Sequence, residues 1–231
     1  MIVALDLPSL AGAEALVHRL RPVTPWFKIG STLFTRAGPD AVRLVQDAGG
    51  QVFLDLKFHD IPQTVAGAVA AAVDLGVALV TVHCAAGPSA LAAAAAARPP
   101  GSTLKLLGVT RLTSDAGRVG ASVVRAALAA RDAGLDGVVA SVRECARIKA
   151  VCGAVFKVLT PGIRPAGAVA HDQARVATPR QAVWAGADYL VVGRPIATAP
   201  DPAAAARAIW HEMTLAARRR RPAHPMATSV P

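Results

Sequence analysis

Short apolar runs alternate with longer segments, in which apolar and charged residues recur at helical spacing, along most of this chain. The apolar runs have the length and Val, Ile and Leu content of buried strands, and the intervening segments have the length of helices. The predicted strands are residues 2–6, 26–29, 52–57, 79–83, 104–109, 137–140, 156–159 and 189–192.

Helices are predicted between these strands, for example at 39–48 and 62–75. Gly76, Gly134 and Gly186 each come shortly before the next strand, where the C-cap of a helix is expected. Eight strand–helix units predict an α/β fold, a closed (β/α)8 TIM barrel in a single domain. An open doubly wound sheet is the alternative.

The predicted barrel domain covers residues 1–217, because no long linker or change of composition divides the chain before that point. Its last helix is predicted at about 201–217. Residues 218–231, RRRRPAHPMATSVP, are predicted to form a basic, disordered tail.

The composition narrows the class of protein further. Hydrophobic residues make up 53% and charged residues 17% of the chain, which favours a globular protein with a large core. No apolar run reaches the roughly 18–20 residues of a membrane span, and the first residues lack the pattern of a signal peptide. The three cysteines have no metal-ligand spacing and are interpreted as reduced thiols. We therefore expect a cytoplasmic protein without a membrane partner or a metal site.

The formal net charge of +10 allows two interpretations. Nucleic-acid binding is one of them. However, four of the arginines lie together at 218–221 and many others are scattered singly, which favours a solvated surface with a basic tail. Part of the positive charge would also suit a phosphorylated, anionic substrate.

Charged residues at the ends of apolar strands are the main candidates for chemistry. The active sites of such barrels lie at the carboxyl ends of the strands, where Asp6, Lys28, Asp55 and Lys57 are found. Asp55 and Lys57 are two residues apart, so on a strand they project to the same side, and Asp60 follows three residues later. A structural ion pair would explain one Asp–Lys pair, whereas a catalytic charge network would also explain Asp6 and Lys28.

A lysine among carboxylates stays protonated, because nearby negative charge favours its cationic form. Such a lysine is a poor nucleophile for Schiff-base chemistry and a good proton donor to a carbanion. Carboxylates that face a substrate carboxylate repel it until CO₂ leaves, so they favour the transition state over the bound substrate. A catalytic charge network of this kind is compatible with loss of CO₂ and protonation of the resulting carbanion.

A second group of residues predicts a phosphate site. Arg164 in TPGIRP ends the seventh strand region, Gln173 lies in the loop that follows, and Gly193 and Arg194 end the eighth strand. Phosphate is often bound after strands 7 and 8 of these barrels. Gly193 permits close backbone approach and Arg194 can make a bidentate contact. Ordinary Gly-Arg turn chemistry is the alternative.

The segment DLKFHDIPQTV, residues 55–65, resembles the signature of the orotidine 5′-phosphate (OMP) decarboxylase family, D-x-K-x-x-D followed by I-P-x-T. Other segments occur in the family's order: ALDL, FKIG, TVH, VTRLTS, TPGIRP, DQARV and VVGRPI. Together they span nearly the whole chain up to the tail. The resemblance implies decarboxylation of OMP to UMP, in pyrimidine biosynthesis, without a metal or an organic cofactor.

The resemblance also implies roles for the charged residues. Asp6 and Lys28 would contact the ribose, and Lys28 would join the charge network. Asp55 would face the departing carboxylate. Lys57 would protonate C6 of the pyrimidine.

The resemblance further implies residues that contact a neighbouring subunit and residues that bind the ribose, pyrimidine and phosphate of the substrate. Asp60 and Thr64 would enter the neighbouring site of a homodimer, and Ile61 would border it. The residues implied at the ribose, pyrimidine and phosphate are Thr113, Arg164, Gln173, Gly193 and Arg194. His59 and His83 are interpreted as packing or hydrogen-bonding residues.

Two alternative functions stay open. A Mg²⁺-dependent sugar-phosphate decarboxylase or aldolase of the same barrel type shares the D-x-K-x-x-D core, although the FHDIPQT, TPGIRP and DQARV segments favour OMP. A catalytically silent barrel could bind a phosphorylated ligand, or nucleic acid through the basic tail. The complete set of Asp55, Lys57 and Asp60 argues against it.

Overall fold

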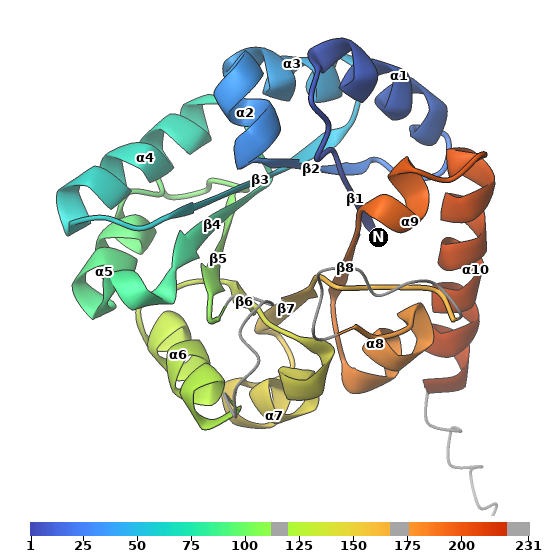
Figure 1. Ribbon diagram of the computed structural model, residues 1–231. Helices are drawn as coiled ribbons and strands as arrows, with labels where there is room; N and C mark the ends of the chain where they lie inside the picture. Colours follow the sequence, from blue (N-terminus) through green and yellow to red (C-terminus); the bar gives the residue numbers. More distant parts are fainter. Residues whose placement is uncertain (112–119, 167–175, 221–231) are drawn as a thin grey trace, which may run out of the picture.

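The computed structural model describes residues 1–111, 120–166 and 176–220. Eight parallel strands pair in sequence order, and β8 closes the sheet by pairing with β1 (Figure 1). The strands are β1 (Ile2–Ala4), β2 (Trp26–Gly30), β3 (Gln51–Phe58), β4 (Leu79–His83), β5 (Lys105–Val109), β6 (Gly137–Val139), β7 (Lys157–Thr160) and β8 (Tyr189–Val192). The predicted (β/α)8 TIM barrel is confirmed.

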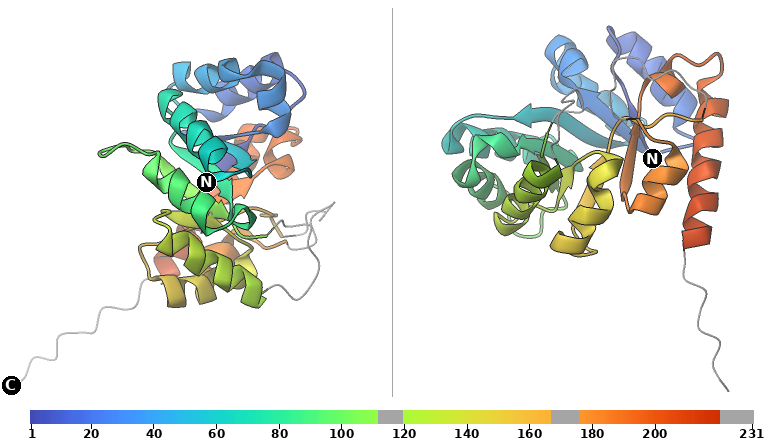
Figure 2. Two further views of the ribbon diagram at one scale, coloured as in Figure 1. Left: turned by 90° about the vertical axis from the view of Figure 1, so that its left-hand side faces the viewer. Right: turned by 60° about the horizontal axis from the view of Figure 1, so that its bottom comes forward.

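Helices follow the strands and surround the barrel (Figure 2). They are α1 (Leu10–Leu20), α2 (Ser31–Ala37), α3 (Pro39–Asp47), α4 (Pro62–Asp74), the 3₁₀ helix η1 (Cys84–Ala86), α5 (Pro88–Ala96), α6 (Gly120–Asp132), α7 (Val142–Cys152), α8 (Pro179–Ala185), α9 (Arg194–Ala197) and α10 (Pro202–Arg220). None of these described helices has both the length and the hydropathy needed to cross a membrane.

Glycines end several helices, as predicted. Gly76, Gly134 and Gly186 have φ values of 66°, 89° and 99°, in the region that residues with a side chain rarely adopt. Gly186 is the left-handed C-cap of α8, and its amide donates to the carbonyl oxygens of Ala182 and Val183. These turns direct each helix back toward the next strand.

The last helix is longer than predicted. Helix α10 continues to Arg220, so the predicted end at Ala217 is wrong by three residues. Arginine has a high helix propensity, and after Pro202 at the start of this helix the next strong helix breaker in the sequence is Pro222. The rest of the predicted tail, 221–231, lies outside the described residues.

The core has two layers. The outer layer lies between the strands and the helices and is mainly aliphatic, with many alanines on the helix side. The inner layer fills the barrel with Ile2, Ala4, Phe53, Leu79, Leu107, Leu159 and Val191, packed against Trp26, Val139 and Tyr189. These apolar side chains fill the barrel interior, and charged side chains lie beyond them at the carboxyl ends of the strands.

Candidate active site

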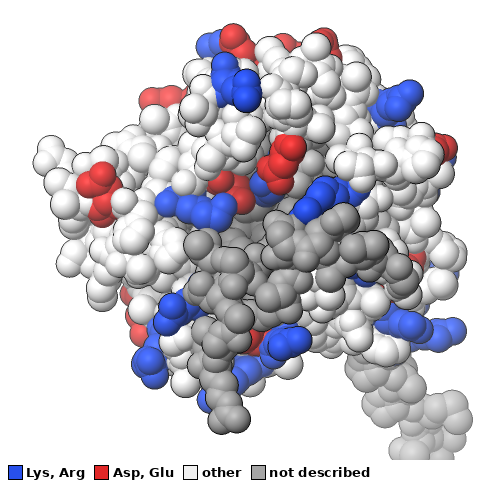
Figure 3. All heavy atoms as spheres, viewed as in Figure 1, with Lys and Arg blue, Asp and Glu red and all other residues white. Residues whose placement is uncertain are grey.

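A pocket opens at the carboxyl ends of the strands, and charged side chains gather around it (Figure 3). Its apolar floor consists of Ala4, Phe53, Val109, Val139, Leu159 and Val191. Its charged lining consists of Asp6, Lys28, Asp55, Lys57, Arg111, Arg164 and Arg194. Basic residues therefore outnumber acidic ones in the described lining, which suits a ligand with several negative charges.

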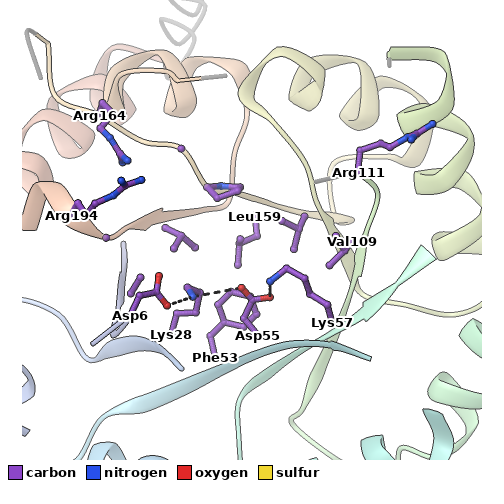
Figure 4. Close-up of a pocket in the computed structure, with 16 residues that line it drawn as sticks. Asp6, Lys28, Phe53, Asp55, Lys57, Val109, Arg111, Leu159, Arg164 and Arg194 are labelled. Carbon is purple, nitrogen blue, oxygen red and sulfur yellow. Dashed lines mark hydrogen bonds and ion pairs between the residues drawn. The ribbon is translucent and has the colours of Figure 1, made fainter. Parts of the chain in front are cut away.

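Four of these residues form a continuous row of ion pairs (Figure 4). Lys57 Nζ lies 2.9 Å from Asp55 Oδ1, and Lys28 Nζ lies 3.6 Å from Asp55 Oδ2. Lys28 Nζ also donates to Asp6 Oδ1 at 2.9 Å. The row comes from three neighbouring strand ends, so an isolated structural pair at the rim does not describe it.

Strand β3 positions Asp55 and Lys57 differently from a regular strand. Its pairing with β4 matches Leu54 to Val80 and then Phe58 to Val82, so three residues of β3 lie opposite one residue of β4. Lys57 has a φ of 54°, the only positive φ of a non-glycine residue in the described chain. Both side chains face the pocket, as strand alternation predicted, but an irregularity that alternation did not predict helps to place them.

Two supporting residues were not predicted. Thr81 donates a hydrogen bond to Asp55 Oδ1 at 3.1 Å and accepts one from the Lys57 amide at 2.9 Å. At Gly30, a β-carbon would lie 2.9 Å from both Asp6 Oδ1 and Lys28 Nζ, so glycine leaves room for that ion pair. A polar residue within an apolar strand and a glycine at a strand end were the signals in the sequence.

The second end of the pocket carries arginines. Arg164, which is buried, and Arg194 lie near each other, opposite the Asp55–Lys57 pair (Figure 4). Gly193 lines the same end and is the N-cap of α9. The structure therefore brings Arg164, Gly193 and Arg194 together as predicted. Arg111, which was not predicted, lines the pocket after β5.

The predicted interface residues lie outside this pocket. Asp60, Ile61 and Thr64 are exposed, and Ile61 keeps 64% of its surface exposed. Asp60 Oδ1 accepts a hydrogen bond from the Ile61 amide at 2.6 Å. None of the three lines the described pocket of its own chain. Thr113 and Gln173, also predicted as site residues, lie outside the described residues.

Histidines and cysteines take other positions. The rings of His59 and His83 stack with centroids 5.0 Å apart, and His83 Nδ1 accepts a hydrogen bond from the Ala85 amide. This arrangement fits the packing interpretation. Burial raises the pKa of the Cys84 thiol to about 12, so at neutral pH this cysteine is a poor nucleophile. Among the described residues, no three His, Cys, Asp or Glu side chains are grouped to hold a metal ion.

Comparisons with known proteins show which proteins this chain is similar to. A curated protein from Moorella thermoacetica, named orotidine 5′-phosphate decarboxylase, is 52% identical and aligns with 93% of this chain and 92% of its own. One of the same name from Nitratidesulfovibrio vulgaris is also 52% identical, over 94% of this chain and 99% of its own.

A solved structure and a family model extend the comparison. The crystal structure of orotidine 5′-phosphate decarboxylase from Lactobacillus acidophilus is 36% identical and superposes with a TM-score of 0.81. The superposition covers 92% of this chain and 98% of that chain. Residues 1–209 match the family model described as orotidine 5′-phosphate decarboxylase / HUMPS family. This matched range includes every residue that lines the pocket. The chain belongs to the orotidine 5′-phosphate decarboxylase / HUMPS family.

Proposed function

We propose that this enzyme converts OMP to UMP and CO₂ in pyrimidine biosynthesis, with Lys57 as the proton donor. One observation carries the proposal. The Lys57 ammonium lies 2.9 Å from Asp55 in a pocket whose other end holds Arg164 and Arg194. A ligand with a carboxylate at one end and a phosphate at the other matches this distribution of charge.

The phosphate binds between Arg194 and the backbone around Gly193. A guanidinium group makes charge-assisted, bidentate contacts with phosphate oxygens, and a glycine permits close backbone approach. Arg164, buried behind this end, supports it. Phosphate binding is distant from the bond that breaks, so its binding energy can orient the reacting ring. Gln173 would complete this end.

The ribose hydroxyls bind Asp6 and Lys28, which are already paired at 2.9 Å. The pyrimidine lies over the apolar floor with its carboxylate near Asp55. Asp55 accepts hydrogen bonds from cations and a hydroxyl, as a negatively charged carboxylate does. Its negative charge repels the substrate carboxylate in the ground state. The repulsion ends when CO₂ leaves, which lowers the barrier. Thr113 would contact the ribose or the pyrimidine.

The proton transfer balances without an added reactant. The bond between C6 and the carboxyl carbon breaks, CO₂ departs and the electron pair stays on C6. Lys57 Nζ then gives its proton to C6, which produces UMP, and the neutral amine recovers a proton from solvent. A positioned general acid serves this step without a metal or an organic cofactor.

The active unit is a homodimer in which Asp60 and Thr64 enter the neighbouring site and Ile61 borders it. The exposure of all three supports this proposal, because it leaves their side chains accessible to a neighbouring subunit. An acid supplied by the neighbour would also add negative charge beside Lys57.

The deciding experiment mixes OMP with metal-free, full-length protein and follows UMP by its ultraviolet spectrum. We expect turnover that EDTA does not change. Activity restored only by Mg²⁺, with a sugar phosphate as substrate, would favour the Mg²⁺-dependent alternative. OMP binding without turnover would favour a silent barrel.

Two further proposals concern the rest of the chain. We place the enzyme in the cytoplasm, which its three free cysteines support. We also propose that residues 221–231, which follow α10, take no part in turnover, so that their removal leaves turnover unchanged.

A further inference from the structure

One buried side chain contacts both partners of the central ion pair. Thr81 lies in the middle of β4, with no exposed surface. Its neighbours Val80 and Val82 belong to the outer core layer, whereas Leu79 belongs to the inner one. The side chain of Thr81 therefore points into the barrel, where it contacts Asp55 and the Lys57 backbone.

The hydroxyl of Thr81 acts as a hydrogen-bond donor and as an acceptor at the same time. It donates to Asp55 Oδ1 at 3.1 Å and accepts from the Lys57 amide at 2.9 Å. The direction of these bonds is fixed, because an ionised carboxylate only accepts and an amide N–H only donates. A side chain without a hydroxyl could satisfy neither group.

The position of Thr81 coincides with the irregularity in the sheet. Between the pairs Leu54–Val80 and Phe58–Val82, Thr81 is the one residue of β4 that lies opposite three residues of β3. Lys57 adopts its positive φ within this stretch. A left-handed conformation is costly for a residue with a side chain, and it persists only where the surroundings hold it.

We propose that Thr81 is a positioning residue for decarboxylation. Its hydroxyl holds the Lys57 backbone in the left-handed conformation and fixes the direction of the Asp55 carboxylate. The distance between Lys57 Nζ and the carbanion is thereby set from β4, a strand that supplies no other group to the charged row. Thr81 touches neither the substrate nor the reacting atoms. This proposal rests on the proposed function of the site.

The test compares Thr81→Val, which keeps the shape and removes the hydroxyl, with Thr81→Ser, which keeps the hydroxyl. We expect Thr81→Val to lower kcat about 10- to 100-fold, the cost of displacing a catalytic group by about 1 Å. Its KM for OMP and its affinity for UMP should stay within about threefold, because the phosphate and ribose contacts are intact. Thr81→Ser should keep at least about a third of kcat.

The matched control is Thr24→Val. Thr24 is also buried, and its hydroxyl also donates to one group, the Met1 carbonyl, and accepts from another, the Trp26 amide. It lies at the opposite end of the barrel. We expect kcat to stay within about twofold in this variant. Equal losses in Thr24→Val and Thr81→Val would overturn the proposal, as would equal losses in the Val and Ser variants at Thr81.

A second measurement does not depend on turnover. Hydrogen exchange of the Lys57 amide, followed by NMR, should be at least about tenfold faster in Thr81→Val than in the unmodified protein and the serine variant. Unchanged exchange would show that Thr81 does not hold this backbone, whatever the substrate is. Unmodified protein that does not convert OMP would instead contradict the proposed function, and the exchange data would still decide the role of Thr81.

Discussion

Both ends of the barrel hold an aspartate that contacts two lysines, and the distances are nearly the same. At the amino-terminal end, Asp188 lies 2.7 Å from Lys149 Nζ and 3.6 Å from Lys157 Nζ. Its Oδ2 also accepts a hydrogen bond from the Val158 amide. Lys149 in turn donates to two backbone carbonyls, so this cluster joins β7, α7 and the start of β8.

At the carboxyl end, Asp55 has a comparable pair of lysines at 2.9 and 3.6 Å, but their surroundings differ. Lys28 and Lys57 both line a cavity. In the described part of the chain, Lys57 Nζ contacts Asp55 and no backbone carbonyl. The protein thus satisfies the polar groups around Asp188 by itself, whereas the groups around Asp55 keep capacity for a ligand.

We propose that this difference distinguishes a structural cluster, around Asp188, from a catalytic one, around Asp55, more clearly than charge or distance does. The Asp188 cluster holds the backbone of neighbouring helices and strands together, and its loss should affect folding. The second faces an open pocket, and its loss should affect turnover.

Lys57→Ala should lower kcat/KM for OMP by at least about 10⁴-fold, the upper range for loss of a positioned general acid. Steady-state kinetics give this value, and circular dichroism checks that the barrel is intact. The matched control is Lys157→Ala, which removes a lysine of the Asp188 cluster and should keep activity within about threefold. Similar losses in both variants would contradict the separation.

Mixing inactive Lys57→Ala and Asp60→Ala proteins should restore activity, if Asp60 serves the neighbouring site. Random subunit exchange would give half hybrid dimers, each with one intact site of two, so about a quarter of the unmodified activity should return. Native mass spectrometry would verify exchange. Hybrids that form and stay inactive would mean that each chain completes its own site.

Asp188→Ala should destabilise the fold by about 2 kcal/mol, because it leaves the Val158 amide without its acceptor and removes the carboxylate that pairs with Lys149 and Lys157. Urea denaturation measures the free energy of unfolding. We expect kcat/KM to stay within about twofold at a temperature where the variant is folded. A stable but inactive variant would show that the amino-terminal cluster also serves the site.

Gly30→Ala should weaken OMP binding while the fold persists. The added methyl group would lie 2.9 Å from the ends of the Asp6 and Lys28 side chains, which can move aside at small cost. Their displacement should raise KM about tenfold, through lost ribose contacts, with a change in unfolding free energy below about 1 kcal/mol. An unchanged KM would argue against ribose binding by this pair.

The barrel and most of the residues that line its pocket could be predicted from the sequence, because the spacing of apolar residues indicates the strands and the position of a charge at a strand end indicates the pocket. Apolar runs marked the strands, and charges at their ends marked Lys28, Asp55 and Lys57. It did not predict Thr81, since the register shift that brings this residue beneath Lys57 depends on how β3 and β4 pair. Gly30 was not predicted for a similar reason. It leaves room for the ion pair of Asp6 and Lys28, and this depends on where those two side chains lie in the folded protein.

Tyr189 can report on the amino-terminal cluster with a small but clean signal, because it is the one tyrosine in the chain. Burial raises the pKa of its phenol, and the charges of Asp188 and Asp136 raise it further. Ultraviolet titration of the folded protein should therefore give a midpoint above the ordinary tyrosine value. Asp188→Asn should lower that midpoint, since it removes a nearby negative charge.

The same shift has a consequence for stability. The unfolded chain binds fewer protons at this group than the folded one once the pH exceeds the ordinary tyrosine pKa. The free energy of unfolding should therefore fall from that pH up to the raised pKa, and less so in Asp188→Asn. An identical midpoint in both proteins would mean that the Asp188 charge is fully compensated by its lysines. Asp55→Asn, at the other end of the barrel, should leave the midpoint unchanged and serves as the control for a general loss of negative charge.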